Sequence, residues 1–341
     1  MTALVARMNK ALIEPDRVWL AIAALFVALA LTAPDQAIAS ATFTVQALVS
    51  VAFFLIASIA IAAYAKASGA DALIARAFTG RSTMMIVSAA LVGALSPFCS
   101  CGVIPLIAAL LAMGVPLPAV MAFWLSSPLM DPSMFVLTLG TLGLTFALFK
   151  TASAIIIGLI GGFGMSALMA GGQFAEPLRA GVGDGGCGAS AVRRQAPVHW
   201  RFWHDESRRQ TFADNALQNL LFLGKWLTLA FVLESLMLAY VPADRVASLV
   251  GGDGLFSIML ATVVGIPAYL NGYAALPLVG GLIEQGMAPG AGMAFLLAGG
   301  VSCIPAAIAV WALAKPPVFA AYLGFAVLGA MSMGLLFALI A

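Results

Sequence analysis

The chain has 341 residues, of which 63% are hydrophobic and only 9% are charged, and its net charge is +2. A soluble domain carries about 25% charged residues, so this composition excludes an ordinary soluble protein and indicates a multi-pass membrane protein. Four cysteines are too few for a disulfide scaffold in a chain of this size, and the small net charge gives no indication of nucleic-acid binding.

The first 40 residues combine a basic start with one apolar run. Arg7, Lys10 and Arg17 precede the apolar run at 18–32, and small residues follow at 39–41. This order is typical of a signal peptide and equally of a first membrane helix. We favour an uncleaved first helix whose N-terminus lies in the cytoplasm, because Lys and Arg concentrate on that side of a membrane.

Residues 41–170 alternate long and short apolar runs. The long runs, 41–63 and 144–169, can each cross a membrane, since a crossing takes roughly 20 residues. A basic interfacial connection at 64–82 follows the first of them. Four shorter runs lie at 84–95, 103–113, 117–127 and 133–141. At about 1.5 Å per residue each is close to half a membrane thick, which predicts half-helices or re-entrant segments.

A polar connection at 171–213 separates this first part from a second apolar part at 214–341. It contains six arginines, His199, His204 and Cys187. We expect a cytoplasmic loop, because arginine is enriched on that side. The histidines and the cysteine lack the spacing of a metal site, and we expect Cys187 to have no role in transport.

The second apolar part repeats the first. A shift of 172 positions, without a gap, aligns the Pro-Leu pairs at 105–106 and 277–278, Gly114 with Gly286, and the Met-Ala-Phe runs at 121–123 and 293–295. The same shift brings the long runs of the two parts into register. Internal repeats with interrupted helices at corresponding places are the best sequence indication of a secondary-transporter binding site.

The basic residues indicate how the two repeats are oriented. The connection at 64–82 carries Lys66, Arg76 and Arg81, whereas its equivalent at 241–253 carries two aspartates and one arginine. Because Lys and Arg favour the cytoplasmic side, the equivalent connections are expected on opposite faces. We therefore predict an all-α polytopic membrane fold. It has two inverted-topology repeats, 41–170 and 214–341, with interrupted or re-entrant half-helices, preceded by the N-terminal segment and helix at 1–40.

Three separated motifs fall on the predicted interruptions. They are Ser-Pro-Phe-Cys-Ser-Cys-Gly-Val-Ile-Pro-Leu at 96–106, Pro-x-Tyr-x-Asn-x-x-Ala-Ala-Leu-Pro-Leu at 267–278, and Ala-Gly-Gly-Val-Ser-Cys-Ile-Pro at 298–305. In this order they resemble the motifs of the ArsP/DUF318 family of predicted permeases. The likeness extends from residue 41 to the C-terminus, apart from the central loop. It implies a membrane permease, with efflux of trivalent organoarsenicals as the best-known activity of the family.

The residues at these interruptions can form one site at mid-membrane depth. The shift aligns Cys99 with Asn271, Cys101 with Tyr273, and Asp131 with Cys303. Inverted repeats would bring the interruptions together, and irregular backbone at that depth is tolerated where it is buried in protein or lines a cavity. Because proline and glycine interrupt helices, we expect the breaks at Pro97, Gly102, Pro128, Pro132, Pro267 and Pro305.

The cysteines have two interpretations. Thiolates suit soft, thiophilic centres, but a cysteine in apolar sequence can equally be a small packing residue. The family resemblance favours substrate binding for Cys99 and Cys101, whereas spacing alone favours packing for Cys303. The polar side chains at 269–273 can contact substrate or satisfy the interrupted backbone. The candidate substrate-binding set is therefore Cys99, Cys101, Cys303, Tyr269, Asn271 and Tyr273.

Three charged residues lie within or beside apolar runs. Asp131 is a candidate for proton coupling, since acids inside membrane segments tend to face cavities or relay protons; it is equally suited to cap a helix that begins at Pro132. Lys225 either extends its amine towards the interface or serves as a counter-charge, and is the second coupling candidate. We expect Glu234 to be interfacial.

The combined pattern predicts a secondary permease that exports trivalent organoarsenicals or related thiophilic species. The alternatives are a transporter of another sulfur-containing solute or soft metal ion, and a membrane thiol–disulfide redox protein. The last is disfavoured because redox pairs usually have Cys-x-x-Cys spacing. We expect no enzyme activity, no ATP-driven transport and no cofactor. The expected partners are a small-molecule substrate and the lipid of a bacterial-type inner membrane, without nucleic acid; a homodimer is compatible with the sequence.

Overall fold

The computed structural model describes residues 17–69, 81–96, 103–112, 114–170, 174, 177–179, 199–240, 254–268 and 272–341. Within these residues the fold is all-α, as the sequence predicts, and the remaining pairing is one isolated antiparallel bridge between Leu178 and Ala314. The first part contains α2 (Arg17–Thr32), α3 (Pro34–Ser68), α5 (Ser82–Ala94), α6 (Ile104–Ala112), α7 (Leu117–Ser126), α8 (Pro132–Leu142) and α9 (Leu144–Met169). A short 3-10 helix, η1 (Phe202–His204), precedes the second part.

The second part has the same sequence of helices. It contains α11 (Glu206–Tyr240), α13 (Leu255–Ala268), α14 (Gly272–Glu284), α15 (Pro289–Val301), α16 (Ile304–Leu313) and α17 (Pro316–Ala338). Shifting the first part by 172 residues places α3 on α11 end for end, since both helices are 35 residues long. The other pairs agree within a few residues, so the two parts are structural repeats.

The repeats also pack in the same way. A Cβ atom on Gly162 of α9 would lie 2.9 Å from the Cβ of Ala122 in α7. A Cβ atom on Gly334 of α17 would lie 2.6 Å from the Cβ of Ala294 in α15, and both residues are the equivalents 172 positions later. Because real Cβ atoms do not approach this closely, each repeat needs glycine here for two helices to touch.

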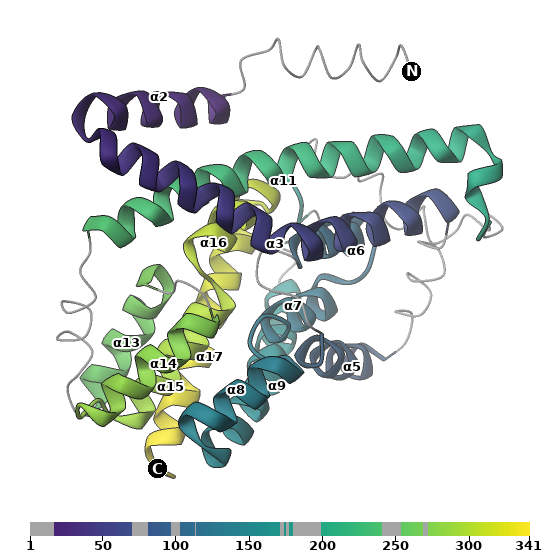
Figure 1. The fold of residues 1–341 in the computed structure, drawn as a ribbon. Helices are drawn as coiled ribbons and strands as arrows, with labels where there is room; N and C mark the ends of the chain where they lie inside the picture. The colour runs from purple at the N-terminus through teal and green to yellow at the C-terminus, as the bar shows by residue number, and fades with distance from the viewer. Residues whose placement is uncertain are drawn as a thin grey trace.

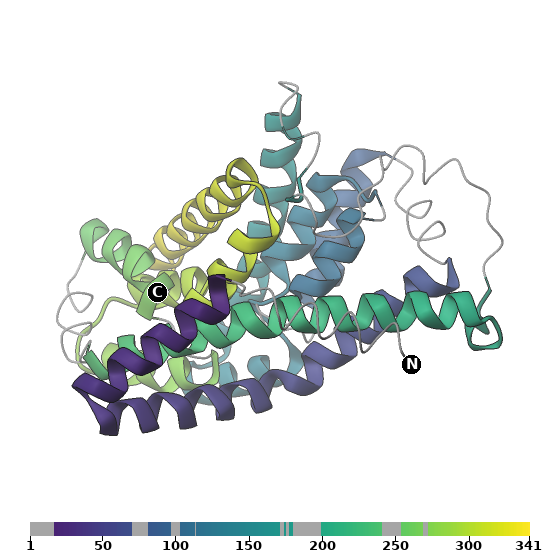
Figure 2. The same cartoon turned by 90° about the horizontal axis from the view of Figure 1, so that it is seen from above.

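Two pairs of equivalent helices, α3 with α11 and α9 with α17, run antiparallel. The backbone N–H of His199 donates to the carbonyl of Ser68 at 2.9 Å, so the start of α11 lies at the end of α3. In the second pair, Phe146 near the start of α9 packs on Phe337 near the end of α17, with ring centroids 5.0 Å apart. Figures 1 and 2 show α3 and α11 side by side across one end of the other helices. This arrangement is what inverted repeats predict.

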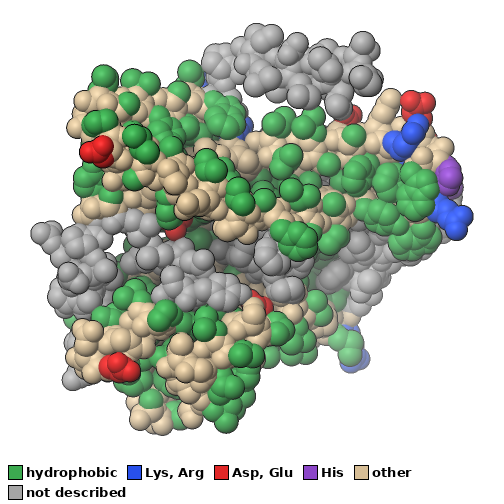
Figure 3. Space-filling model, in the orientation of Figure 1, with side chains coloured by type: hydrophobic (Ala, Val, Ile, Leu, Met, Phe, Trp, Pro, Cys, Tyr) green, Lys and Arg blue, Asp and Glu red, His purple; other side chains and the backbone are tan. Residues whose placement is uncertain are grey.

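The helix lengths and the surface fit a membrane. Among the described residues four helices are long and apolar enough to span, and α15 with α16 makes a fifth if this pair, bent by 40°, is one span. Large apolar side chains face outward, with Leu31 81% and Phe256 76% exposed. Figure 3 shows such side chains over the visible face, whereas charged side chains gather at the end where η1 joins α11. The chain is therefore a polytopic membrane protein.

Three expected boundaries differ from the structure. The first repeat begins before residue 41, because α3 begins at Pro34. The connection at 64–82 begins later than expected, because α3 continues to Ser68 and ends at Gly69, whose φ of 76° suits glycine. The connection at 171–213 ends earlier, because α11 begins at Glu206. Part of it also packs on the second repeat, where the backbone N–H of Lys315 donates to the carbonyl of Pro177 at 2.9 Å.

The membrane orientation of the repeats gives the first testable prediction. Single cysteines introduced as Ala75→Cys and Ala247→Cys, in equivalent connections outside the described residues, should react with a membrane-impermeant maleimide from opposite faces. Labelling of right-side-out and everted vesicles of a cysteine-free variant separates the faces. Labelling of both positions from the same face would contradict the inverted arrangement.

Candidate functional site

Each repeat has a backbone interruption before its penultimate helix. In the first repeat α7 ends at Ser126 and α8 begins at Pro132, and in the second α15 ends at Val301 and α16 begins at Ile304. A proline in the first turn of α8 and of α16 fixes where each helix starts, since proline lacks the N–H that a continuous helix would need. These interruptions place Asp131 and Cys303 at equivalent N-cap positions.

Asp131 caps α8 in the ordinary way. Its Oδ1 accepts the backbone N–H of Met134 at 2.8 Å and also the hydroxyl of Ser133. Cys303 has the same extended backbone at the start of α16, but its side chain makes no capping hydrogen bond. A thiol is a weak acceptor, so capping does not explain why cysteine occupies this position.

Cys303 lies beside a buried acid. The thiol is 9% exposed and forms no disulfide, and Glu234 of α11 is 4% exposed. The two groups interact electrostatically. Glu234 is thus buried within the protein on α11, a helix that packs on α3 and α16, and its interfacial depth in the membrane stays a prediction. A buried carboxyl group and a buried thiol at a helix break are thus close enough to influence each other electrostatically.

Lys150 of α9 is a buried cation that the sequence analysis missed. It is 1% exposed, and Asp131 is its electrostatic neighbour. The internal repeat could have pointed to Lys150, because the shift of 172 positions aligns this lysine with Tyr322, an uncharged residue, in the second repeat. Asp131 is therefore the electrostatic neighbour of Lys150, whereas its equivalent, Cys303, is that of Glu234.

Tyr322 holds the second interruption in place. Its hydroxyl donates to the carbonyl of Val301, the last residue of α15, at 2.6 Å. Its ring stacks on Trp124 of α7, with centroids 4.8 Å apart and planes inclined by 27°. This contact joins a helix of the first repeat to the backbone interruption of the second. A movement of one repeat relative to the other would therefore shift the backbone interruption next to Cys303.

The remaining candidates lie mostly outside the described residues. These are Pro97, Cys99, Cys101, Gly102, Cys187, Tyr269 and Asn271, together with the side chain of Tyr273. Pro267 lies in the last turn of α13, which ends at Ala268, and Pro128 lies between α7 and α8. Lys225 is half-buried, with its Nζ 5.7 Å from the centre of the Phe222 ring. The convergence of all the interruptions in one cavity stays a prediction.

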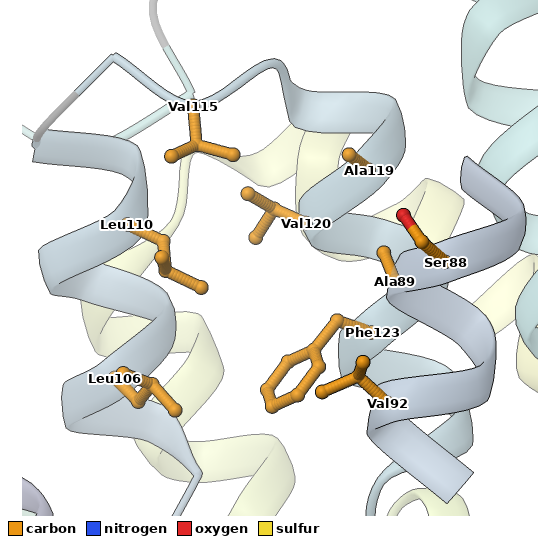
Figure 4. Close-up of a pocket in the computed structure, with 9 residues that line it drawn as sticks. All are labelled: Ser88, Ala89, Val92, Leu106, Leu110, Val115, Ala119, Val120 and Phe123. Carbon is orange, nitrogen blue, oxygen red and sulfur yellow. The ribbon is translucent and has the colours of Figure 1, made fainter. Parts of the chain in front are cut away.

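A cavity of about 210 Å³ lies between α5, α6 and α7 (Figure 4). It is lined by Ser88, Ala89, Val92, Leu106, Leu110, Val115, Ala119, Val120 and Phe123. Ser88 is the only polar residue among them, and its hydroxyl donates to the carbonyl of Met85 in its own helix. The cavity thus offers an apolar surface between the two helices that flank residues 97–102. It suits a small apolar organic group.

Comparison with known proteins identifies one family. The model of the ArsP_1 family, described as a predicted permease, matches residues 37–339. Two curated relatives are UPF0718 proteins. YcgR of Bacillus subtilis is 23% identical over 192 residues, which cover 56% of this chain and 60% of YcgR. MJ0584 of Methanocaldococcus jannaschii is 24% identical over 131 residues, which cover 38% of this chain and 36% of MJ0584.

The aligned regions therefore span less than two thirds of these relatives. No solved structure matches the chain.

Proposed function

This chain belongs to the ArsP_1 family of predicted permeases, and we propose that it exports trivalent organoarsenicals or related thiophilic species across the inner membrane. Family membership shows a permease but neither its cargo nor the direction of transport. We propose both here, for a carrier that binds its cargo within the membrane. The N-terminus and the basic end of the α3–α11 pair are assigned to the cytoplasm.

One observation carries the proposal, namely the buried thiol of Cys303 beside the carboxyl group of Glu234 at the start of α16. Sulfur binds soft trivalent arsenic, whereas a hard oxyanion gains nothing from a thiol. When the thiol displaces a hydroxyl group from arsenic, one S–As bond forms, one As–O bond breaks, and water leaves. In this proposal Glu234 takes the thiol proton and passes it to the departing hydroxide.

The first repeat would supply the other two thiols. Cys99 and Cys101 lie in the sequence between α5 and α6, and both of these helices line the apolar cavity. A trivalent arsenical with one organic group has two positions left for sulfur, so a pair of thiols matches its valence. The apolar cavity would accept the organic group. Because such a complex is uncharged, it avoids the cost of placing an ion in the membrane interior.

Uptake into everted vesicles tests the proposal directly. Vesicles that contain the wild-type protein should accumulate methylarsenite several-fold over vesicles without it, and should discriminate against selenite and arsenite. The Cys303→Ser variant is the matched control, since serine keeps the size of the side chain and removes the soft ligand. Equal accumulation of all three compounds, or of none, would contradict the proposed cargo.

A further inference from the structure

Lys150 is the only charged residue in α9, and it lies in a candidate membrane span. At about 1.5 Å per residue it lies about 9 Å from the start of that helix. Its side chain is 1% exposed, so it does not extend to the membrane surface. Ionisable residues inside membrane segments are costly and commonly mark ion or proton pathways.

The surroundings of Lys150 offer one acid. The helices packed against α9 are α5, α7, α8, α15 and α17, and all of them are fully described. Their titratable side chains, N-cap residues included, are Asp131 before α8, Arg81 before α5, Lys315 before α17, and Tyr322 within α17, so Asp131 is the one acid. Among the described residues no carboxylate oxygen lies within 4.0 Å of the Lys150 amine, so Asp131 is its electrostatic neighbour without being in direct contact.

Asp131 already has a structural task. Its Oδ1 accepts hydrogen bonds from Met134 and Ser133, and this capping task needs an acceptor that stays in place. Lys150 has no comparable capping task. Of the two groups, the amine is therefore the one that can gain and lose a proton without disturbing the start of α8.

The residue of the second repeat that is equivalent to Lys150 shows that a neutral side chain is sufficient for the structure at this position. The equivalent residue, Tyr322, donates its hydroxyl to the carbonyl of Val301 at the interruption. A neutral donor thus satisfies the backbone in that repeat. The first repeat has an amine instead, so it adds a group whose charge can change near physiological pH when its environment changes.

Two buried hydroxyl groups near this part of the fold have no hydrogen-bond partner among the described residues. Ser153 is 0% exposed and lies one turn along α9 on the same face as Lys150, and Ser127 is 1% exposed and precedes Asp131 at the interruption. Unsatisfied buried hydroxyls are rare and costly. They provide acceptors for the amine in a second arrangement of the helices.

From these contacts we propose that Lys150 carries the coupled proton of the transporter, with Asp131 as its fixed counter-charge. This inference rests on the proposed export function for its physiological meaning. In one access state the amine binds a proton from the external side and is balanced by Asp131. In the other state it releases that proton to the cytoplasm and its neutral amine hydrogen-bonds to the buried hydroxyls. No other chemical change is involved.

Two substitutions of Lys150 separate charge from structure. Lys150→Tyr introduces the residue of the second repeat and should fold, since a tyrosine is accommodated at the equivalent position. Lys150→Arg keeps a positive charge that cannot be released at accessible pH. In proteoliposomes loaded with a pH-sensitive dye, a methylarsenite gradient should drive proton movement with wild-type protein. Both variants should lose this movement at least tenfold.

Asp131→Asn provides the matched control, because asparagine caps a helix about as well as aspartate. It should shift the pH dependence of transport without abolishing proton movement. Loss of all coupling in Asp131→Asn, together with normal coupling in Lys150→Tyr, would show that Asp131 carries the coupled proton. That result would overturn the proposal.

A second measurement does not depend on the cargo. The melting temperature of the purified protein, measured from roughly pH 5 to pH 10, between the ordinary carboxyl and lysine titrations, should change differently with pH in wild type and Lys150→Tyr. Coincident profiles would show that Lys150 does not titrate and would overturn this inference. Failure of wild-type protein to move methylarsenite, with distinct profiles, would instead refute the proposed cargo and leave Lys150 as the titrating group.

Discussion

Cells that produce the Cys99→Ser/Cys101→Ser double variant should lose the methylarsenite resistance conferred by the wild-type protein. Serine preserves size and hydrogen bonding but is a hard oxygen ligand, so binding of a soft centre should weaken by at least tenfold for each thiol. The measurement is growth over a methylarsenite series in a strain without other arsenic exporters. Quantitative immunoblots of the membrane fraction show whether the variant is as abundant as wild type.

The other two cysteines make this experiment specific. Cys187→Ser should leave resistance unchanged, because that residue lies in the polar connection between the repeats. Cys303→Ser should reduce resistance partially, because its buried thiol is a third one, to which the bound arsenical can be passed. A double variant of Cys99 and Cys101 that still exports at the wild-type rate would remove the thiol mechanism. The cargo would then be sought among polar solutes.

Sequence alone was sufficient for the helical architecture. Prolines and glycines mark helix ends because they act locally, so the short helices from α5 to α8 begin and end within a few residues of the expected runs. The 172-residue shift also predicted the correspondence of α3 with α11, although not their full length. Polar residues such as Gln36 lie within α3, where a hydropathy pattern alone would not extend the helix.

The electrostatic neighbours could not be predicted in the same way. Glu234 lies near the end of an apolar run, where an interfacial position is the ordinary expectation, and its burial depends on the packing of α11 against other helices. Lys150 resembles a lysine near the start of a span, which commonly extends to the membrane surface. Its burial depends on the helices packed against α9, among them α5, α7 and α17, which are distant in sequence. Side-chain surroundings of this kind are tertiary properties.

The glycine contacts give the prediction with the largest expected effect on folding. Gly162→Leu and Gly334→Leu should each reduce the yield of folded protein severely and by similar amounts. A Cβ atom at either position would lie within 3.0 Å of an alanine Cβ in the neighbouring helix of its own repeat. Overpacking a close-packed interface costs about 1–3 kcal/mol, and more where, as here, two helix backbones must separate.

Gly140→Leu and Gly324→Leu are the matched controls. A Cβ atom added at either position would have no neighbouring atom within 4 Å, so leucine there has room and gains helix propensity of roughly 0.5–1 kcal/mol over glycine. Melting temperatures and monodisperse yield in detergent should therefore stay at or above wild type. Equal tolerance of leucine at all four positions would contradict the close packing. A large loss at Gly162 with none at Gly334 would show that the two repeats do not depend on the same contact, and the structural equivalence of their cores would be rejected.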